Sequence, residues 1–192
     1  EGLPATVARF KDKVRFRELL APRHPDFFYR AVPLAGLGDL DPAALPSPFV
    51  IKPAVGFFSM AVRRVADPAD WPAALEAIRL ELDQVAGHYP SAVLDAGTFI
   101  VEACVEGEEY ALDVHYDADG APVVLNVLHH RFRSPEDTSD RLYLTSAEIV
   151  REGIERFGGE LAWLGEAAGL RNFPMHVEFR LEPDGGVFPI EV

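Results

Sequence analysis

The chain has 192 residues, of which 48% are hydrophobic and 10% aromatic, and its formal net charge is −13. This composition excludes a disordered chain and is typical of a globular protein with a real core, in one domain or two small lobes. The acidic balance argues against a broad basic surface for nucleic acid and against attraction to an anionic membrane.

The first half of the chain predicts two helices and a pair of strands around a proline-rich segment. Apolar residues at helical spacing predict a first helix over residues 6–20. The proline-rich stretch 22–48 contains one short apolar run, FFYRAV, that is compatible with a strand. The runs PFVIKPA and MAVRRV predict two strands, joined by the loop VGFFS. Asp67 or Asp70 is expected to cap a helix that reaches about Gly87.

The second half predicts a strand-rich lobe with one helix. TFIVEACVEG predicts a strand that runs into a Glu-Gly corner, and Asp119-Gly120 between two extended runs predicts a hairpin. Thr145 and Glu148 have capping-box spacing and predict the start of a helix. The glycine pair Gly158-Gly159 is expected to weaken or bend this helix. The order of elements indicates an α+β fold in two lobes that divide near residues 100–104.

The closing segment, HVEFRLEPDGGVFPIEV, places two acids in otherwise apolar strands. A hairpin that turns at Asp184-Gly185 makes Glu178 and Glu191 direct partners across the two strands. Facing Cβ atoms lie about 4.5–5.5 Å apart, and like charges there are destabilising. A bound divalent cation such as Mg²⁺ would offset the repulsion, because it takes carboxylate oxygens as ligands.

The acid pair is also compatible with interpretations that involve no metal. Arg180 or His176 could offset the repulsion as salt-bridge partners, and a pair of acids on a solvated hairpin face needs no ligand at all. A turn at Gly185-Gly186 would remove the facing pair.

Two further stretches have residue types that suit a nucleotide. In VIKPAVGFFS, Lys52 ends a strand and is followed by a glycine-containing loop with Ser59, which suits phosphate oxygens. In VEACVEGEEY, a strand-end corner carries Glu102 and Glu109, which suits an adenine edge and a ribose hydroxyl. Each stretch by itself also fits an ordinary surface lysine or a solvated acidic turn. The chain has no GK[ST] sequence, so the loop is not of the Walker type.

The order of these stretches resembles the ATP-grasp superfamily, and the resemblance covers nearly all of the chain. Members typically show K-P-x-x-G-x-x-S, then V-E-x-x-x-x-G-x-E, then H-x-E and a final I-E-x-N. This chain has Lys13 in KDKVRFRELL, followed by VIKPAVGFFS, VEACVEGEEY and the closing hairpin. The resemblance implies an ATP-grasp fold, with two α+β lobes clasping a nucleotide, and the use of ATP to activate a carboxylate.

The resemblance also implies roles for matching residues. The two lysines, Lys13 and Lys52, and the turn after Lys52 match the groups that contact the ATP phosphates. Glu102 and the main chain of the residues after it match the adenine hinge. Glu109 matches the residue that accepts a hydrogen bond from a ribose hydroxyl. The implied nucleotide-binding residues are Lys13, Lys52, Gly56, Ser59, Glu102, Ala103, Val105 and Glu109. Glu178 and Glu191 match the Mg²⁺ carboxylates. The implied catalytic residues are Lys52 and Arg131, with Arg133 as the alternative to Arg131 near the terminal phosphate.

On this basis we expect three segments. Residues 1–45 form a first helix and a connecting segment, residues 46–101 a small lid with the phosphate loop, and residues 102–192 the larger subdomain with the hinge and the metal acids. Met60 stands where a small residue is common, and the usual final Asn would be the residue after Val192. We therefore expect a chain truncated at both ends, without the Rossmann-like lobe that commonly precedes these lobes.

The expected activity is an ATP-dependent carboxylate–amine ligase that works through an acylphosphate, with Mg²⁺ or Mn²⁺ as the metal. A phosphotransferase on the same fold and a non-catalytic ATP-binding domain are the alternatives. The expected partners are a small-molecule carboxylate and an amine, with no nucleic acid and no membrane, and a homodimer is compatible with the resemblance. Since Cys104 is the single cysteine and no signal peptide or long apolar run is visible, we expect a cytoplasmic protein.

Overall fold

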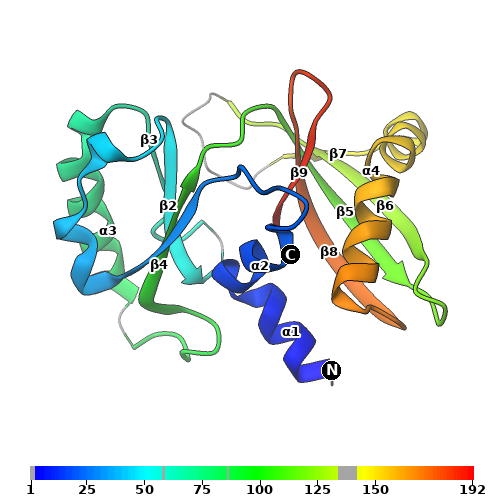
Figure 1. The fold of residues 1–192 in the computed structure, drawn as a ribbon, viewed down its shortest axis with the longest axis horizontal. Coiled ribbons are helices and arrows are strands. Elements are labelled where there is room, and N and C mark those ends of the chain that lie inside the picture. Colours follow the sequence, from blue (N-terminus) through cyan, green and yellow to red (C-terminus); the bar gives the residue numbers. More distant parts are fainter. Residues whose placement is uncertain (1–2, 58, 86, 134–141) are drawn as a thin grey trace. The chain divides into compact units, whose positions relative to one another are not determined.

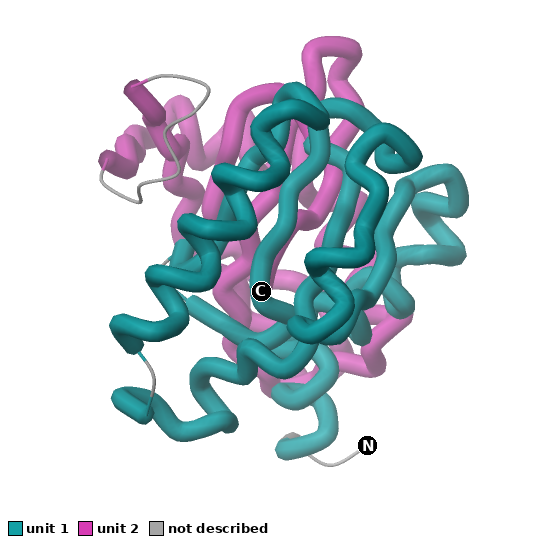
Figure 2. The backbone as a smooth tube through the Cα atoms, turned by 90° about the vertical axis from the view of Figure 1, so that its left-hand side faces the viewer, with its two compact units in different colours: residues 1–104 teal, residues 105–192 magenta. Residues whose placement is uncertain are grey.

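The computed structural model describes residues 3–57, 59–85, 87–133 and 142–192 (Figure 1). The chain divides into two compact units, residues 1–104 and residues 105–192, which Figure 2 distinguishes by colour. Each unit has its own antiparallel sheet, so the mixture of helices and antiparallel strands agrees with the predicted α+β fold.

Unit 1 is built on a four-stranded sheet in the order β1-β4-β2-β3. Side chains on its strands alternate between two faces, and one face forms a core with α3 through residues such as Phe49, Ile51 and Ile78. The helices and strands of this unit are α1 (Leu3–Lys11), α2 (Lys13–Leu20), β1 (Tyr29–Pro33), β2 (Phe49–Val55), β3 (Arg63–Val65), α3 (Trp71–Val85) and β4 (Asp95–Ala103), with short 3₁₀ helices η1 (Leu34–Asp39), η2 (Pro42–Ala44) and η3 (Pro68–Asp70).

Unit 2 is built on a five-stranded sheet in the order β7-β6-β5-β8-β9, and α4 lies along one of its faces (Figure 1). Phe157 of α4 packs against the rings of Tyr110 and Phe179, and the hydroxyl of Tyr116 donates to the carbonyl of Leu161 at 2.8 Å. The elements of this unit are β5 (Glu108–Tyr116), β6 (Pro122–His130), β7 (Tyr143–Leu144), α4 (Ala147–Ala168), β8 (Phe173–Leu181) and β9 (Val187–Glu191).

The first predicted helix is two helices, which corrects the expectation for residues 6–20. The carboxylate of Asp12 accepts hydrogen bonds from the backbone N–H groups of Val14 and Arg15, so a new helix begins at Lys13. An N-cap side chain satisfies backbone donors that would otherwise be unpaired at a helix start. The apolar spacing continues across Asp12, which is why periodicity alone predicts one helix.

Two other boundaries differ from the prediction. The expected strand MAVRRV is shortened to β3, because Ala61 has φ 54° and Met60 N–H donates to the carbonyl of Phe57 in a turn. The N-cap of α4 is Ser146 instead of Thr145, since the Ser146 hydroxyl accepts from the N–H of Ile149. The glycine pair at 158–159 lies inside α4, which continues to Ala168.

No helix within the described ranges has both the length and the apolar character that crossing a membrane requires.

Candidate functional site

Helix α2 places Lys13 against the loop that follows β2. Lys13 is buried, with 5% exposure, and its ammonium donates to the carbonyl of Gly56 at 3.2 Å. The loop turns back at Ser59, which has φ 53° and whose carbonyl accepts from the N–H of Val62. The structure therefore brings together Lys13 and the beginning of the predicted phosphate loop.

The second predicted lysine, Lys52, lies in a buried charge cluster with Glu102 and Arg17. The Lys52 ammonium is 2.7 Å from Oε1 of Glu102. Arg17 donates from Nε to Oε2 at 2.8 Å and from Nη2 to Oε1 at 3.2 Å. The exposures of the three residues are 1% for Arg17, 4% for Glu102 and 7% for Lys52.

Local structure explains how the three side chains meet. In the antiparallel pair of β2 and β4, Val50 faces Glu102, so Lys52, two residues further along β2, is a diagonal neighbour of Glu102 on the same face. Lys13 and Arg17 are four residues apart on α2 and therefore lie on one side of that helix.

The cluster keeps Glu102 ionised. Burial by itself would raise the pKa of Glu102, but the charges of Arg17 and Lys52, together with their hydrogen bonds, outweigh it and lower the pKa from 4.5 to about 2. Both carboxylate oxygens are engaged by cations, so the side chain of Glu102 is an anchor for these cations in the structure.

In unit 2, Glu109 occupies a comparable position between two basic side chains. Nη2 of Arg180 is 2.6 Å from Oε2 of Glu109, and Nδ1 of His130 is 2.7 Å from Oε1. Arg180 also donates to the carbonyl of Gly107 at 2.9 Å, and its guanidinium lies over the ring of Phe132. Glu109 is 7% exposed, so the predicted ribose acceptor is held in one place by its neighbours.

The closing hairpin places Glu178 directly opposite Glu191, as predicted. Both residues are partly buried. The two basic residues considered as their partners have other carboxylate partners: Arg180 pairs with Glu109, and Nδ1 of His176 lies 2.8 Å from Asp113. Glu178, Arg180 and His176 alternate with Val177 and Phe179 along β8, so they share the sheet face opposite α4.

The facing pair offers two carboxylates as metal ligands. Within the described ranges, no group of three or more His, Cys, Asp and Glu side chains could hold a metal ion by itself. Two carboxylates alone fit Mg²⁺, which usually keeps several water molecules and binds through one or two carboxylates plus substrate phosphates. The donor set is therefore compatible with a magnesium–nucleotide complex.

Several predicted site residues lie apart from these clusters in the contacts that the structure records. Arg131 is exposed, and its Nη1 lies 3.9 Å from Oε1 of Glu108. The N–H of Ala103 donates to the carbonyl of Phe28 at 3.0 Å, so this backbone donor is already engaged. Val105 is partly buried.

Sequence reasoning missed Arg17 and His130 as members of the candidate site. The one usable signal for Arg17 is its distance of four residues from Lys13, which places the two on one side of α2. For His130, the adjacent pair at 129–130 in a strand indicates that the two rings lie on opposite faces, but not which one meets Glu109.

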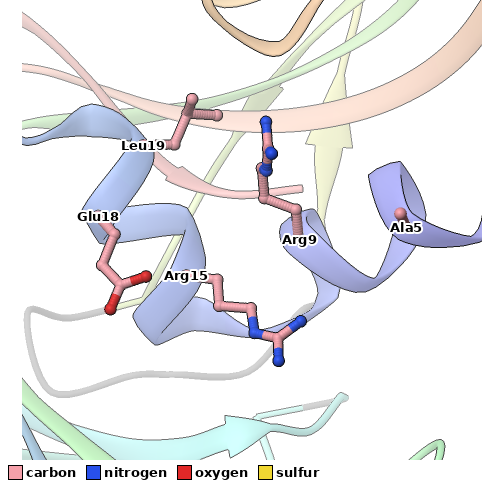
Figure 3. Close-up of a pocket in the computed structure, with 5 residues that line it drawn as sticks. All are labelled: Ala5, Arg9, Arg15, Glu18 and Leu19. Atoms are coloured by element: carbon pink, nitrogen blue, oxygen red, sulfur yellow. The ribbon is translucent and has the colours of Figure 1, made fainter. Parts of the chain in front are cut away.

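A separate hollow of about 500 Å³ lies beside the first two helices (Figure 3). Ala5 and Arg9 of α1 and Arg15, Glu18 and Leu19 of α2 line it. None of these residues belongs to the predicted site, and Arg15 already pairs with Asp12 at 3.5 Å.

A family model described as an ATP-grasp domain matches residues 45–192 of this chain. No curated protein matches the chain. Among solved structures, an L-amino acid ligase from Bacillus licheniformis is similar over the whole chain, at 24% identity and a TM-score of 0.72. The D-Ala:D-Ser ligase VanG from Enterococcus faecalis (21% identity, TM-score 0.68) and a biotin carboxylase from Campylobacter jejuni (15%, 0.68) each match 97% of it.

At these identities the structural likeness shows the fold. The chain spans 42%, 52% and 40% of the lengths of these three proteins, respectively, so it corresponds to about half of each.

Proposed function

The chain belongs to the ATP-grasp family, and we propose that it is the nucleotide-binding part of an ATP- and Mg²⁺-dependent ligase that activates a carboxylate as an acylphosphate. The observation that carries the proposal is the direct pairing of Glu178 with Glu191 across β8 and β9. A magnesium–nucleotide complex would take two facing carboxylates as ligands, and the cation would offset the repulsion between their like charges.

The proposed nucleotide contacts follow from the two clusters. In unit 1, Lys13, Lys52 and the turn from Gly56 to Ser59 bind the phosphate oxygens, and the main chain of Ala103 and Val105 contacts the adenine. Glu102 acts chiefly by fixing Lys52 beside the phosphates, because both of its carboxylate oxygens are held by cations. In unit 2, Glu109 accepts a ribose hydroxyl, with Arg180 and His130 holding its carboxylate in position.

Glu178 and Glu191 would hold Mg²⁺, or Mn²⁺ in its place, and the metal supplies charge withdrawal from the phosphate oxygens when it is bound. Lys52 and Arg131 balance the charge of the transferred phosphoryl group. An oxygen of the substrate carboxylate forms a bond to the γ-phosphorus, and the bond to ADP breaks. An amine then forms a bond to the acyl carbon, inorganic phosphate leaves, and the amine loses a proton to the solvent.

The substrates in this proposal are a small-molecule carboxylate and an amine. Two of the similar structures are, by name, ligases of amino acids, which supports this substrate class. The formal charge of −13 favours small molecules over nucleic acid as acceptors. We further propose a cytoplasmic protein, which suits a sequence with a single cysteine and an enzyme that needs a pool of ATP.

The proposal is tested first by nucleotide binding and then by turnover. ATP with Mg²⁺ is expected to raise the melting temperature, whereas ATP with EDTA should raise it less. Phosphate release that requires both a carboxylate and an amine, surveyed with the L-amino acids in pairs, supports the ligase. A persistent phosphorylated product would instead indicate a phosphotransferase. Nucleotide binding without turnover of any amino acid pair would indicate a non-catalytic nucleotide-binding domain. The absence of any nucleotide effect on melting would refute the proposal.

A further inference from the structure

The cluster of Arg17, Glu102 and Lys52 contains more charge than a simple ion pair. Lys52 lies on the sheet and Arg17 on α2, and they share one carboxylate, with Oε1 of Glu102 contacted by both. The carboxylate of Glu102 therefore connects Lys52, which has a proposed role in phosphate binding, with Arg17, to which no role has yet been assigned.

Arg17 is held firmly at its end of the cluster. Its guanidinium makes a bidentate contact with the two oxygens of Glu102. This geometry fixes the orientation of the guanidinium relative to the carboxylate as well as the distance between them. The rings of Phe16 and Phe27 each lie 5.5 Å from the guanidinium carbon and confine it further. With 1% exposure, Arg17 is the largest fully buried side chain of the described residues.

Lys52 retains donor capacity that Glu102 does not use. An ammonium group has three N–H donors. Glu102 is the partner that the described part of the chain records for the Lys52 ammonium, at Oε1. Two N–H groups of a side chain that is only 9% exposed are therefore still available to a ligand.

We propose that Arg17 is a positioning residue for the nucleotide phosphates, because it occupies Glu102 and so leaves the charge of Lys52 available to a phosphate oxygen. This inference rests on the proposed function, in which Lys52 contacts phosphate. Without Arg17, the carboxylate of Glu102 can turn to face Lys52 with both oxygens and neutralise it.

The charges of the three side chains make the inference testable. Arg17 and Lys52 each contribute +1 and Glu102 contributes −1, so the three side chains sum to +1. Replacing Arg17 by methionine leaves Lys52 and Glu102, which sum to zero. A second change, Glu102→Gln, returns the sum to +1 with Lys52 as the charged group. A buried charge acts strongly on a nearby phosphate, because the effective dielectric constant is low there.

The experiment measures the dissociation constants of Mg²⁺-ADP and of adenosine by calorimetry on the full-length protein. Adenosine lacks phosphates and therefore reports on the rest of the site. We expect Arg17→Met to weaken ADP binding about tenfold, the usual effect of losing one charge-assisted contact, and to change adenosine binding less than about twofold. Adding Glu102→Gln should restore ADP binding to within about threefold of the wild type.

Two further variants complete the design. Arg15→Met removes an exposed arginine from the same helix and should leave both constants unchanged. Arg17→Lys keeps the positive charge but cannot make the bidentate contact, and this variant is used if Arg17→Met does not fold. We expect it to weaken ADP binding about threefold, with adenosine binding unchanged.

The outcomes separate the inference from the proposed function. If the wild type binds neither ATP nor ADP, the proposed function is wrong and the inference falls with it. If the wild type binds ADP but Arg17→Met and Arg17→Lys bind it equally well, only the inference is overturned. The inference is also overturned if Arg17→Met loses affinity for ADP and adenosine equally, or if adding Glu102→Gln does not restore ADP affinity. Either result would mean that Arg17 only supports the fold.

Discussion

Glu178 faces Glu191 across the edge of the sheet in unit 2, but the hairpin does not bring them together by the predicted register. Nearer the turn, Phe179 pairs with Pro189, and a bulge then leaves Ile190 as an extra residue on β9. Proline has no N–H for a ladder bond, so it is tolerated on an edge strand next to a bulge. The bulge shifts the register by one residue and restores the acid pair.

The acid pair gives the first prediction. Glu191→Gln should remove most of the rise in melting temperature that we expect from ATP with Mg²⁺ in the wild type, because the proposed metal site loses one of its two carboxylates. At a ligand concentration of about one hundred times Kd, the wild-type rise corresponds to roughly 2.7 kcal/mol, or several degrees. Differential scanning fluorimetry with and without EDTA measures the effect.

The matched control is Glu155→Gln, which removes the same charge from an exposed position on α4. It should retain the full shift. A Glu191→Gln protein that is stabilised by ATP with Mg²⁺ as strongly as the wild type would remove this residue from the metal site.

The hairpin also illustrates how far the sequence can predict this site. The turn residues and the alternation correctly indicated that Glu178 and Glu191 share a face. The actual loop has three residues, since the N–H of Glu182 donates to the carbonyl of Gly186, and Gly185 adopts φ 90°. Turn length and bulge each shift the register by one residue, and their shifts cancel. Neither can be derived from the residue types alone.

The charge cluster marks the limit of local reasoning. Glu102 was expected at an adenine hinge, but its carboxylate is occupied by Arg17, which is 85 positions away in the chain. An arginine in an amphipathic helix usually indicates a solvated face, so its residue type alone does not indicate that Arg17 is buried. The contact depends on how α2 packs on the sheet, which periodicity does not determine. The order of the motifs predicted the fold, because that order involves many residues along the whole chain and not one local contact.

The cap of α2 gives the second prediction. Asp12→Ala should lower the free energy of unfolding by about 1 kcal/mol, because two N–H groups at the helix start lose their acceptor. Since α2 carries Lys13 and Arg17, the affinity for ADP should fall as well. Urea unfolding and calorimetry measure the two effects. Asp12→Asn keeps an oxygen acceptor and should lose much less of either. Equal losses in the two variants would assign the effect to the charge of Asp12 and not to the cap.

Two glycines of α4 give the third prediction, with opposite signs. Gly159 is exposed and a methyl group there would meet nothing within 4 Å, so Gly159→Ala should stabilise the protein by about 0.5–1 kcal/mol through helix propensity. A methyl group on Gly165 would overlap the ring of Tyr116, so Gly165→Ala should destabilise the protein by about 1–3 kcal/mol despite the same gain in propensity.

A double-mutant cycle separates the overlap from other causes. Tyr116 is fully buried, and Tyr116→Leu removes the ring that a methyl group on Gly165 would meet. Gly165→Ala should therefore cost less in the Tyr116→Leu background than in the wild type, as measured by urea unfolding. The same cost in both backgrounds would show that the ring is not the obstacle.

The lowered pKa of Glu102 gives the last prediction, on acid stability. The pKa is about 2 in the folded protein against an ordinary value of 4.5, so the carboxylate binds a proton more readily after unfolding. The stabilisation from this group is therefore fully present above pH 4.5 and is lost as the pH falls from about 4.5 towards 2. Over that range it amounts to on the order of 3 kcal/mol.

Urea unfolding at pH 7, 5, 4 and 3 checks this prediction against Glu102→Gln, which cannot take up a proton. At pH 7 the variant should be less stable, because Arg17 and Lys52 are buried without their shared anion. The difference from the wild type should shrink as the pH falls below 4.5, since protonation makes the wild-type residue neutral too. Glu18→Gln, at an exposed position of α2, should follow the wild-type curve. A gap between wild type and Glu102→Gln that stays constant from pH 7 to pH 3 would mean that Glu102 does not ionise with the lowered pKa that its two cations impose.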